Sequence, residues 1–384
     1  MEKNPEFDDI RPFYDEEVPV VIETLLSDSQ FLHVANQVFP AEDWAKFEAI
    51  MRKIKNKKDF QQGIIKGGLY GIVSKTIDSM RCSGFENVSK KGAYTYISNH
   101  RDIVLDAALL AIMLDTEGYE TMEIAIGDNL LLFPWIENLV KLNKSFIVKR
   151  GICVRQMLDV STHLSRYIHF AIKDKHESIW IAQREGRAKN SNDKTQESVL
   201  KMLAIGGEGN FVDRIRELNI APVSLSYQYD PCDFLKAKEF QQKRDNPEFM
   251  KSKEDDLLNM RTGIMGYKGN VHFQIGRPIN SDVEQLNLSL PKNELAEKIA
   301  SLIDREIYLN YKFYPGNYIA YDRLWGKNHF VNKYDSKDIH VFDNYMNQQL
   351  DKIDIENKDI PYLKEKFLEM YAYPVKNYLT TINE

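Results

Sequence analysis

From Tyr94 onwards, short apolar runs alternate with longer amphipathic stretches, and this alternation restricts the fold more than any other feature of the sequence. Six runs are typical of strands: 94–98, 123–127, 145–149, 178–182, 220–227 and 271–276. Most of the stretches between them are long enough for crossover helices. Alternating strands and helices favour an α/β fold, here a mixed, largely parallel sheet covered by helices, with helical extensions at both ends.

The regions before and after this part of the chain have a different spacing of apolar residues. Between Phe13 and Met80, apolar residues recur at spacings of three and four, which predicts helices. The tyrosine-rich chain after Pro278 also has a helical pattern. We therefore predict a helical N-terminal region (1–84), an α/β domain (85–295) and a helical C-terminal extension (296–384). The charge-rich segment 230–262 is predicted to form a helical excursion from the sheet.

Composition excludes some classes of function. A net charge of −6 argues against a protein built to coat nucleic acid. The three cysteines (Cys82, Cys153 and Cys232) are far apart and lack metal-ligand spacing, which indicates a reducing compartment with neither disulfides nor a metal site. We expect a cytoplasmic protein.

Membrane contact is expected to be peripheral. The first residues are acidic and lack the apolar core of a signal peptide. The longest apolar run, 103–114, is interrupted by Asp106 and is too short to span a bilayer. The basic run 52–58 is read as a solvated helix face, with contact to anionic lipid headgroups on the inner face of the membrane as the alternative.

The most informative stretch is Y-I-S-N-H-R-D-I-V-L-D-A-A-L-L, residues 96–110. A strand ends at Asn99–His100 and an apolar helix follows, so His100 lies where α/β sheets place catalytic groups, and Asp102 is placed to cap the helix. Asp106 inside the apolar helix needs a partner, and His100 is the candidate. The two can meet only if the turn between them is not helical. A surface histidine with Asp106 turned toward solvent is the alternative.

Three further strands end in groups suited to a phosphate. The strand at 145–149 delivers Lys149 and Arg150, the strand at 178–182 precedes R-E-G-R-A-K, and 220–227 contains Pro222. Arginine can bind phosphate bidentately, lysine acts as a point charge, and glycine allows close backbone approach. Each cluster alone is typical of a protein surface, but their shared position at strand ends indicates an anion site.

The order of these segments resembles the four sequence blocks of the glycerolipid acyltransferases, the glycerol-3-phosphate and 1-acylglycerol-3-phosphate acyltransferase superfamily, over roughly residues 85–280. By this resemblance, N-H-R-D-I-V-L-D supplies a catalytic dyad of His100 and Asp106. The implied substrate-binding residues are Arg101, Lys149, Arg150, Glu185, Gly186, Arg187, Lys189 and Pro222. Two departures indicate a divergent branch: five residues rather than four separate the dyad, and Arg187 follows Gly186 directly.

The resemblance implies an O-acyltransferase of phospholipid biosynthesis. It would move a fatty acyl group from a thioester, either acyl-CoA or an acyl carrier protein, to a hydroxyl of glycerol 3-phosphate, lysophosphatidate or a related lipid, with no cofactor. His100 would act as general base, with Asp106 orienting it and backbone N–H groups near Asp102 stabilising the oxyanion. The expected partners are these substrates and the membrane surface. A non-catalytic lipid-binding module with the same groove and basic cluster is the alternative.

Other enzyme classes fit the sequence poorly. His100-Arg101-Asp102 spells the kinase catalytic triplet, but Ala107 stands where a kinase needs Asn, and Asp-Phe-Gly is absent. A serine hydrolase would need Gly-x-Ser-x-Gly, which is also absent, and no histidines or cysteines have zinc-ligand spacing.

Overall fold

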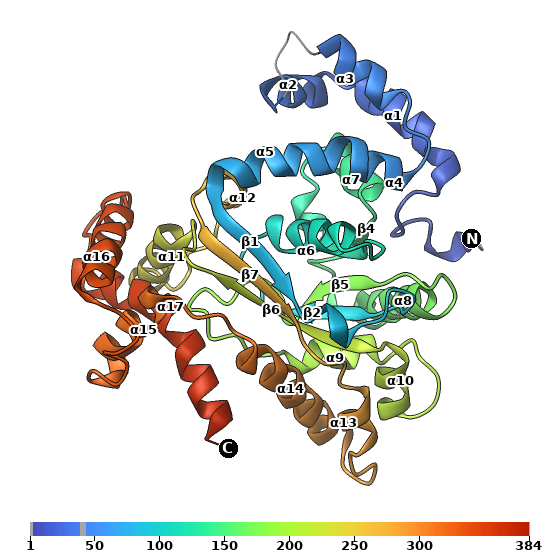
Figure 1. Ribbon diagram of the computed structural model, residues 1–384. Coiled ribbons are helices and arrows are strands. Elements are labelled where there is room, and N and C mark those ends of the chain that lie inside the picture. The colour runs from blue at the N-terminus through green and yellow to red at the C-terminus, as the bar shows by residue number, and fades with distance from the viewer. Residues whose placement is uncertain (1–2, 39–43, 384) are drawn as a thin grey trace.

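The computed structural model describes residues 3–38 and 44–383; residues 1–2 and 39–43 of the predicted N-terminal region, and residue 384 of the predicted C-terminal extension, lie outside the described residues. Its centre is a seven-stranded sheet in the order β1-β7-β6-β2-β5-β3-β4 (Figure 1). β6 and β7 pair antiparallel and every other neighbouring pair is parallel, which confirms the predicted mixed, largely parallel sheet. The strands are β1 (Ile77–Ser83), β2 (Thr95–Ser98), β3 (Glu123–Gly127), β4 (Ser145–Val148), β5 (Ile179–Ala182), β6 (Ile220–Tyr227) and β7 (Gly269–Ile275).

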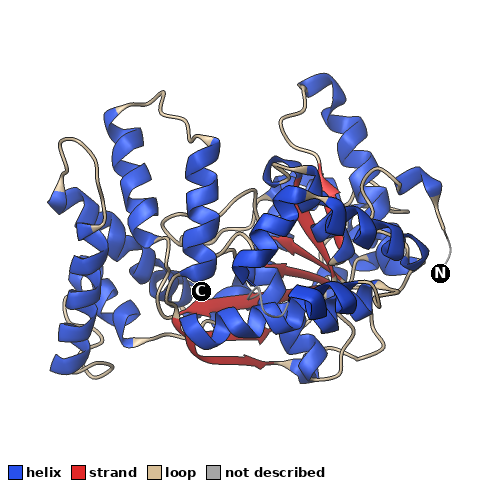
Figure 2. Ribbon diagram, turned by 90° about the horizontal axis from the view of Figure 1, so that it is seen from above, coloured by secondary structure: helices blue, strands red, loops and turns tan. Residues whose placement is uncertain are grey.

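Helices surround the sheet and form both extensions (Figure 2). The α-helices are α1 (Val18–Ser27), α2 (Ser29–Val38), α3 (Trp44–Met51), α4 (Lys57–Phe60), α5 (Lys66–Thr76), α6 (Leu105–Thr116), α7 (Pro134–Leu142), α8 (Val154–Lys173), α9 (Glu197–Leu203), α10 (Phe211–Glu217), α11 (Asp233–Asp245), α12 (Lys253–Met265), α13 (Asn280–Glu284), α14 (Lys292–Leu309), α15 (Pro315–Tyr321), α16 (Ser336–Asp351) and α17 (Ile360–Ile382). Single 3-10 or π turns are η1 (Pro5–Phe7), η2 (Asp15–Glu17), η4 (Gln61–Ile65), η5 (Phe85–Asn87), η6 (Asp128–Leu130) and η7 (Asp322–Gly326).

Both faces of the sheet are buried. On one face, α8, α9, α10 and α14 pack around Phe146 and Ile220. On the other, α5 and α6 cover Leu225 and Phe273. Burial on both sides explains why strands β2 to β6 read as nearly continuous apolar runs, whereas β7 alternates between buried and partly exposed residues. All eight residues of β6 are buried, as expected for a central strand.

The six predicted strands are present, and the structure adds a seventh. Residues Ile77–Ser83, predicted to belong to the helical N-terminal region, form edge strand β1 and pair with β7. The prediction of helix up to Met80 is therefore wrong over 77–80. The sequence I-D-S-M-R-C-S has little periodicity of its own, and pairing with a strand about 190 residues away decides its conformation.

The extensions pack on different sides of the sheet. α1 and α3 bury a small core with α7 beyond α5, whereas α15, α16 and α17 pack on α11 of the 230–262 excursion (Figure 1). The predicted boundary at 295–296 divides α14, whose buried face packs on the sheet beside β6. In the ranges 3–38 and 44–383, no helix is long and apolar enough to cross a membrane.

Candidate active site

The turn between β2 and α6 brings the predicted dyad together. β2 ends at Ser98 and α6 begins only at Leu105, so residues 99–104 form a non-helical turn at the C-terminal end of a central strand. His100 Nδ1 and Asp106 Oδ2 lie 2.7 Å apart. The side chain of Asp106 is 1% exposed and that of His100 13% exposed. The pair therefore closes despite the extra residue in the spacer, and Asp106 does not face solvent.

The five intervening residues fit because the turn wraps around the carboxylate. The backbone N–H groups of Arg101 and Asp102 donate to Asp106 Oδ2 at 2.6 and 3.0 Å. The hydroxyl of Tyr227, the last residue of β6, donates to the other oxygen, Oδ1, at 2.9 Å. With His100, Asp106 accepts four hydrogen bonds, which offset the cost of burying a carboxylate in an apolar helix.

Asn99 fixes the start of this turn. Its side-chain amide donates to the carbonyl of Leu225 at 3.0 Å and accepts from the N–H of Leu225 at 2.8 Å. The side chain thus continues the β2–β6 hydrogen-bond ladder where the main chain leaves the sheet. The edge of the His100 imidazole packs against Trp180 of β5, with ring centroids 5.7 Å apart.

Arg101 is held inside the protein. Its guanidinium makes a bidentate ion pair with Asp193, with Nη1 2.9 Å from Oδ1 and Nη2 2.5 Å from Oδ2. The side chain of Arg101 is 7% exposed and that of Asp193 is 1% exposed. Tyr311 donates to the same carboxylate at 2.6 Å. Asp193 thus occupies the Arg101 guanidinium, and the contact of Arg101 with substrate remains a prediction that would require this ion pair to open.

Asp102 binds the start of the helix as predicted, although Val104 occupies the capping position. Its Oδ1 accepts from the N–H groups of Val104 and Leu105 at 2.9 and 2.7 Å. Burial raises the pKa of Asp102, and the charge of Asp106 raises it further. The N–H groups of residues 101, 102, 104 and 105 all donate to carboxylates, so the prediction that N–H groups here stabilise an oxyanion is wrong for these four.

Most of the predicted binding residues at strand ends are paired with acids. Lys149 pairs with Asp9, and Lys189 Nζ lies 2.6 Å from Glu239. Arg150 and Glu185, predicted on separate strand ends, meet at 2.6 Å. Pro222 lies in the middle of β6, buried and in register with Ile97, so it is not at the strand end where the dyad lies.

Arg187 differs from these basic residues. Its Nη2 donates to Asn259 of α12 at 3.2 Å, while Nη1 is buried without a hydrogen-bond partner in the part of the chain that the structure describes. Burial disfavours its charged form, but the neighbouring Cys232, Asp230 and Asp102 outweigh this and raise the pKa of Arg187. The preceding Gly186 has φ +66°, a backbone conformation that favours glycine, although the space around it is open. An unsatisfied, charged N–H group is suited to an anion.

α12, which follows α11 in the charge-rich region, packs on the catalytic turn, and the sequence does not indicate this contact. α12 lies so close to the turn that a Cβ on Gly263 would lie 1.9 Å from Asp102 Oδ2. Lys268, just after α12, is fully buried, and burial lowers its pKa to about 8. Sequence reasoning also missed Tyr227 and Asp193. Tyr227 could have been suspected, since a tyrosine ending a buried strand needs a partner for its hydroxyl.

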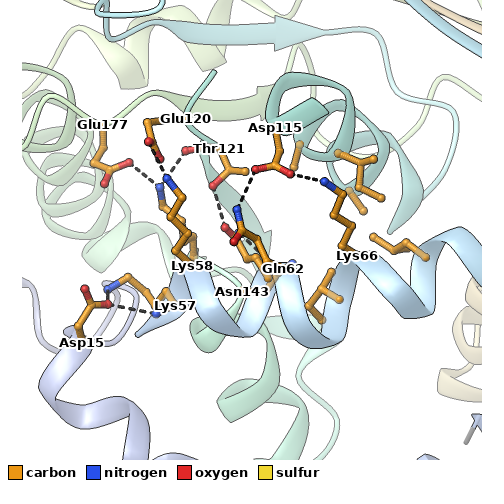
Figure 3. Close-up of a pocket in the computed structure, with 17 residues that line it drawn as sticks. Asp15, Lys57, Lys58, Gln62, Lys66, Asp115, Glu120, Thr121, Asn143 and Glu177 are labelled. Carbon is orange, nitrogen blue, oxygen red and sulfur yellow. Dashed lines mark hydrogen bonds and ion pairs between the residues drawn. The ribbon is translucent and has the colours of Figure 1, made fainter. Parts of the chain in front are cut away.

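A cavity of about 130 Å³ lies at the N-terminal ends of strands β3, β4 and β5, whereas the dyad lies at the C-terminal end of β2 (Figure 3). Thr121, Asn143 and Glu177, which line it, stand just before β3, β4 and β5 rather than after them. Its four lysines each pair with an acid: Lys57 with Asp15, Lys58 with Glu120, Lys66 with Asp115 and Lys144 with Glu177. The cavity is therefore separate from the dyad. Among the described residues, no group of three or more His, Cys, Asp or Glu side chains could hold a metal ion.

Comparison with known proteins points to one family. Residues 79–206 match the family model described as Acyltransferase, a segment that includes His100, Asp106 and Arg187. No curated protein matches the sequence. A solved structure with some similarity is the 1-acyl-sn-glycerophosphate (LPA) acyltransferase PlsC from Thermotoga maritima, 11% identical, with a TM-score of 0.34, over 76% of this chain and 95% of that one. This likeness is too distant to locate residues of the site.

Proposed function

We propose that this chain is an O-acyltransferase of the glycerolipid acyltransferase superfamily and that it works by general-base catalysis at His100; the match of residues 79–206 to the Acyltransferase family model supports the first part. The observation that supports this is the 2.7 Å hydrogen bond between His100 and Asp106, formed across a turn whose length departs from the family pattern. We further propose that the acceptor is a phosphorylated glycerolipid precursor, glycerol 3-phosphate or lysophosphatidate, and that the donor is acyl-CoA or an acyl carrier protein.

The chemistry follows from the two ring nitrogens. With Nδ1–H donating to Asp106, the Nε2 atom of His100 carries the free lone pair. Nε2 takes the proton of the acceptor hydroxyl as that oxygen attacks the thioester carbonyl carbon. The carbon–sulfur bond then breaks and the thiolate takes the proton from the imidazolium. Asp106 holds the tautomer and stabilises the imidazolium between these steps.

Arg187 is proposed to bind the acceptor phosphate. Its buried Nη1 has an N–H group without a hydrogen-bond partner among the described residues, and phosphate oxygens would satisfy it. Arg150 and Lys149 are weaker candidates because each pairs with a carboxylate that a phosphate would have to displace. Lys189 is held in the same way by Glu239.

Peripheral contact with the inner face of the membrane is also proposed. The outward side of α12 exposes Leu257, Leu258 and Met265, while Gly263 on its other side packs on Asp102. Because α12 packs on the catalytic turn, apolar side chains on its outward side would bring the turn close to a bilayer that holds the lipid acceptor. A non-catalytic lipid-binding module would present the same surface, and turnover of a thioester separates the two functions.

The test is an acyl-transfer assay with labelled acyl-CoA or acyl carrier protein and a panel of acceptors, with the lipid product identified by mass spectrometry. His100→Ala is expected to abolish transfer. The matched control is His163→Ala, which removes another histidine paired with an aspartate, Asp9, at 2.9 Å. Arg187→Ala is expected to raise the KM for the acceptor more than the KM for the donor. Near parental turnover by His100→Ala would refute the proposed function.

A further inference from the structure

The two oxygens of the Asp106 carboxylate have unequal support. Oδ2 receives three donors: His100 Nδ1 and the N–H groups of Arg101 and Asp102. Oδ1 receives one, the hydroxyl of Tyr227. The first three donors belong to the turn itself, whereas Tyr227 comes from another strand, 121 residues further along the chain. Among the described residues, Tyr227 is therefore the one hydrogen-bond donor that ties the orientation of the carboxylate to a second strand of the sheet.

β6 is built to deliver this hydroxyl. Its last register partner in β2 is Ser98, which lies opposite Val223, and β6 continues for four more residues toward the site before it ends at Tyr227. There it still pairs with β7, with Tyr227 opposite Val271, and the Tyr227 ring packs against Phe273. Burial, followed by the charge of Asp106, raises the pKa of Tyr227 well above its usual value, so the phenol keeps its proton and stays a donor.

We infer that Tyr227 is a positioning residue for acyl transfer: its hydroxyl fixes the plane of the Asp106 carboxylate so that Oδ2 faces His100 Nδ1. The inference rests on the proposed function, because it acts through the dyad. Without the hydroxyl, Oδ1 is a buried acceptor that lacks this donor. Rotation of the carboxylate, or entry of a water molecule beside it, then lowers the free energy of the site. Either change misplaces the imidazole relative to the acceptor hydroxyl, whereas the binding of both substrates is unaffected.

The test is Tyr227→Phe, which keeps the ring and removes only the hydroxyl. We expect kcat to fall by about 10- to 100-fold, the range for losing a hydrogen bond to a charged group, with both KM values unchanged. The matched control is Tyr96→Phe in β2, a buried tyrosine that is not hydrogen-bonded to Asp106 and whose replacement should leave kcat near the parental value.

A double-mutant cycle with Asp106→Asn shows whether Tyr227 acts through Asp106. If it does, Tyr227→Phe produces no further loss of kcat in the Asp106→Asn background. A purely structural role would give losses that multiply. If Tyr227→Phe fails to fold, 3-fluorotyrosine at position 227 keeps the hydroxyl and makes it a stronger donor. It should draw charge from Asp106 and move the acidic limb of the pH–kcat/KM profile to lower pH, whereas an unmoved profile would contradict the inference.

The two proposals fail in different ways. Activity in His100→Ala refutes the proposed function, and the role of Tyr227 falls with it. Loss of activity in His100→Ala together with parental kcat in Tyr227→Phe refutes the role of Tyr227 alone. Multiplicative losses in the cycle also refute it, even if Tyr227→Phe is impaired.

Discussion

The Arg101–Asp193 ion pair allows a sharp prediction about what holds the catalytic turn. Arg101 directly follows His100, and its N–H group donates to Asp106, so any movement of Arg101 moves the dyad. Asp193 lies after β5, on a different strand connection, and holds the guanidinium with both oxygens. We predict that Asp193→Ala destabilises the protein severely and lowers acyl transfer as a consequence.

The expected size follows from the burial of the pair. Removing one partner leaves the Arg101 charge buried and uncompensated, which costs about 3–5 kcal/mol. Tyr311 also loses its acceptor, which adds about 1 kcal/mol. Unfolding entropies of about 2.1 cal/mol/K per residue give roughly 0.8 kcal/mol/K for cooperative unfolding of 384 residues. The melting temperature should therefore fall by about 5–7 °C.

The assay is thermal unfolding followed by circular dichroism, with urea unfolding as a second measure. The control is Asp343→Ala, which breaks an exposed pair with Arg323 and should cost less than about 1 kcal/mol. The double variant Arg101→Met/Asp193→Leu removes both charges and should recover most of the lost stability, since buried pairs can be replaced by apolar residues. If Asp193→Ala melts within 1 °C of Asp343→Ala, the buried pair does not hold the turn.

Two further outcomes are expected. Burial lowers the pKa of Lys268 to about 8, below the pKa of this lysine in the unfolded chain. Between about pH 8 and 10 the unfolded chain therefore binds more protons than the folded protein, and the folded state gains stability as pH rises. Urea unfolding at several pH values gives the free energy of unfolding of the parent and of Lys268→Met. The stability of the parent relative to the variant should rise by up to about 1.4 kcal/mol per pH unit in this range. A difference that stays constant with pH would contradict this. Leu257→Ser/Leu258→Ser should weaken co-sedimentation with anionic vesicles about tenfold or more, whereas Leu288→Ser, an exposed leucine before α14, should not. Equal losses in both variants would exclude α12 as the contact.

The dyad was predictable because its signal is local. A strand end, a histidine and a carboxylate six residues later in an apolar helix leave the carboxylate few other partners. The requirement for a non-helical turn followed from helix geometry, and residues 99–104 meet it. What the sequence could not indicate is how the extra residue is absorbed, because two backbone N–H groups rather than side chains turn toward Asp106.

The predicted substrate contacts depend on a different kind of information. Arg101 and Lys189 were predicted to bind substrate from their neighbours in the sequence, but their acid partners, Asp193 and Glu239, lie 92 and 50 positions away. A basic residue is available for a phosphate only when no such partner reaches it. The same holds for β1, whose strand conformation depends on β7. Local patterns predict elements and candidate groups, whereas pairing over long distances decides which groups remain free.

This distinction also explains why the site tolerates a spacer that departs from the family pattern. If Asp106 were oriented only by its own helix, an added residue upstream would turn the histidine away from it. Here Tyr227 of β6 holds the carboxylate, Leu225 of β6 holds the side chain of Asn99, and Asp193 beyond β5 holds Arg101. Because these anchors lie outside the turn, the length of the turn can vary while the 2.7 Å contact between His100 and Asp106 is kept.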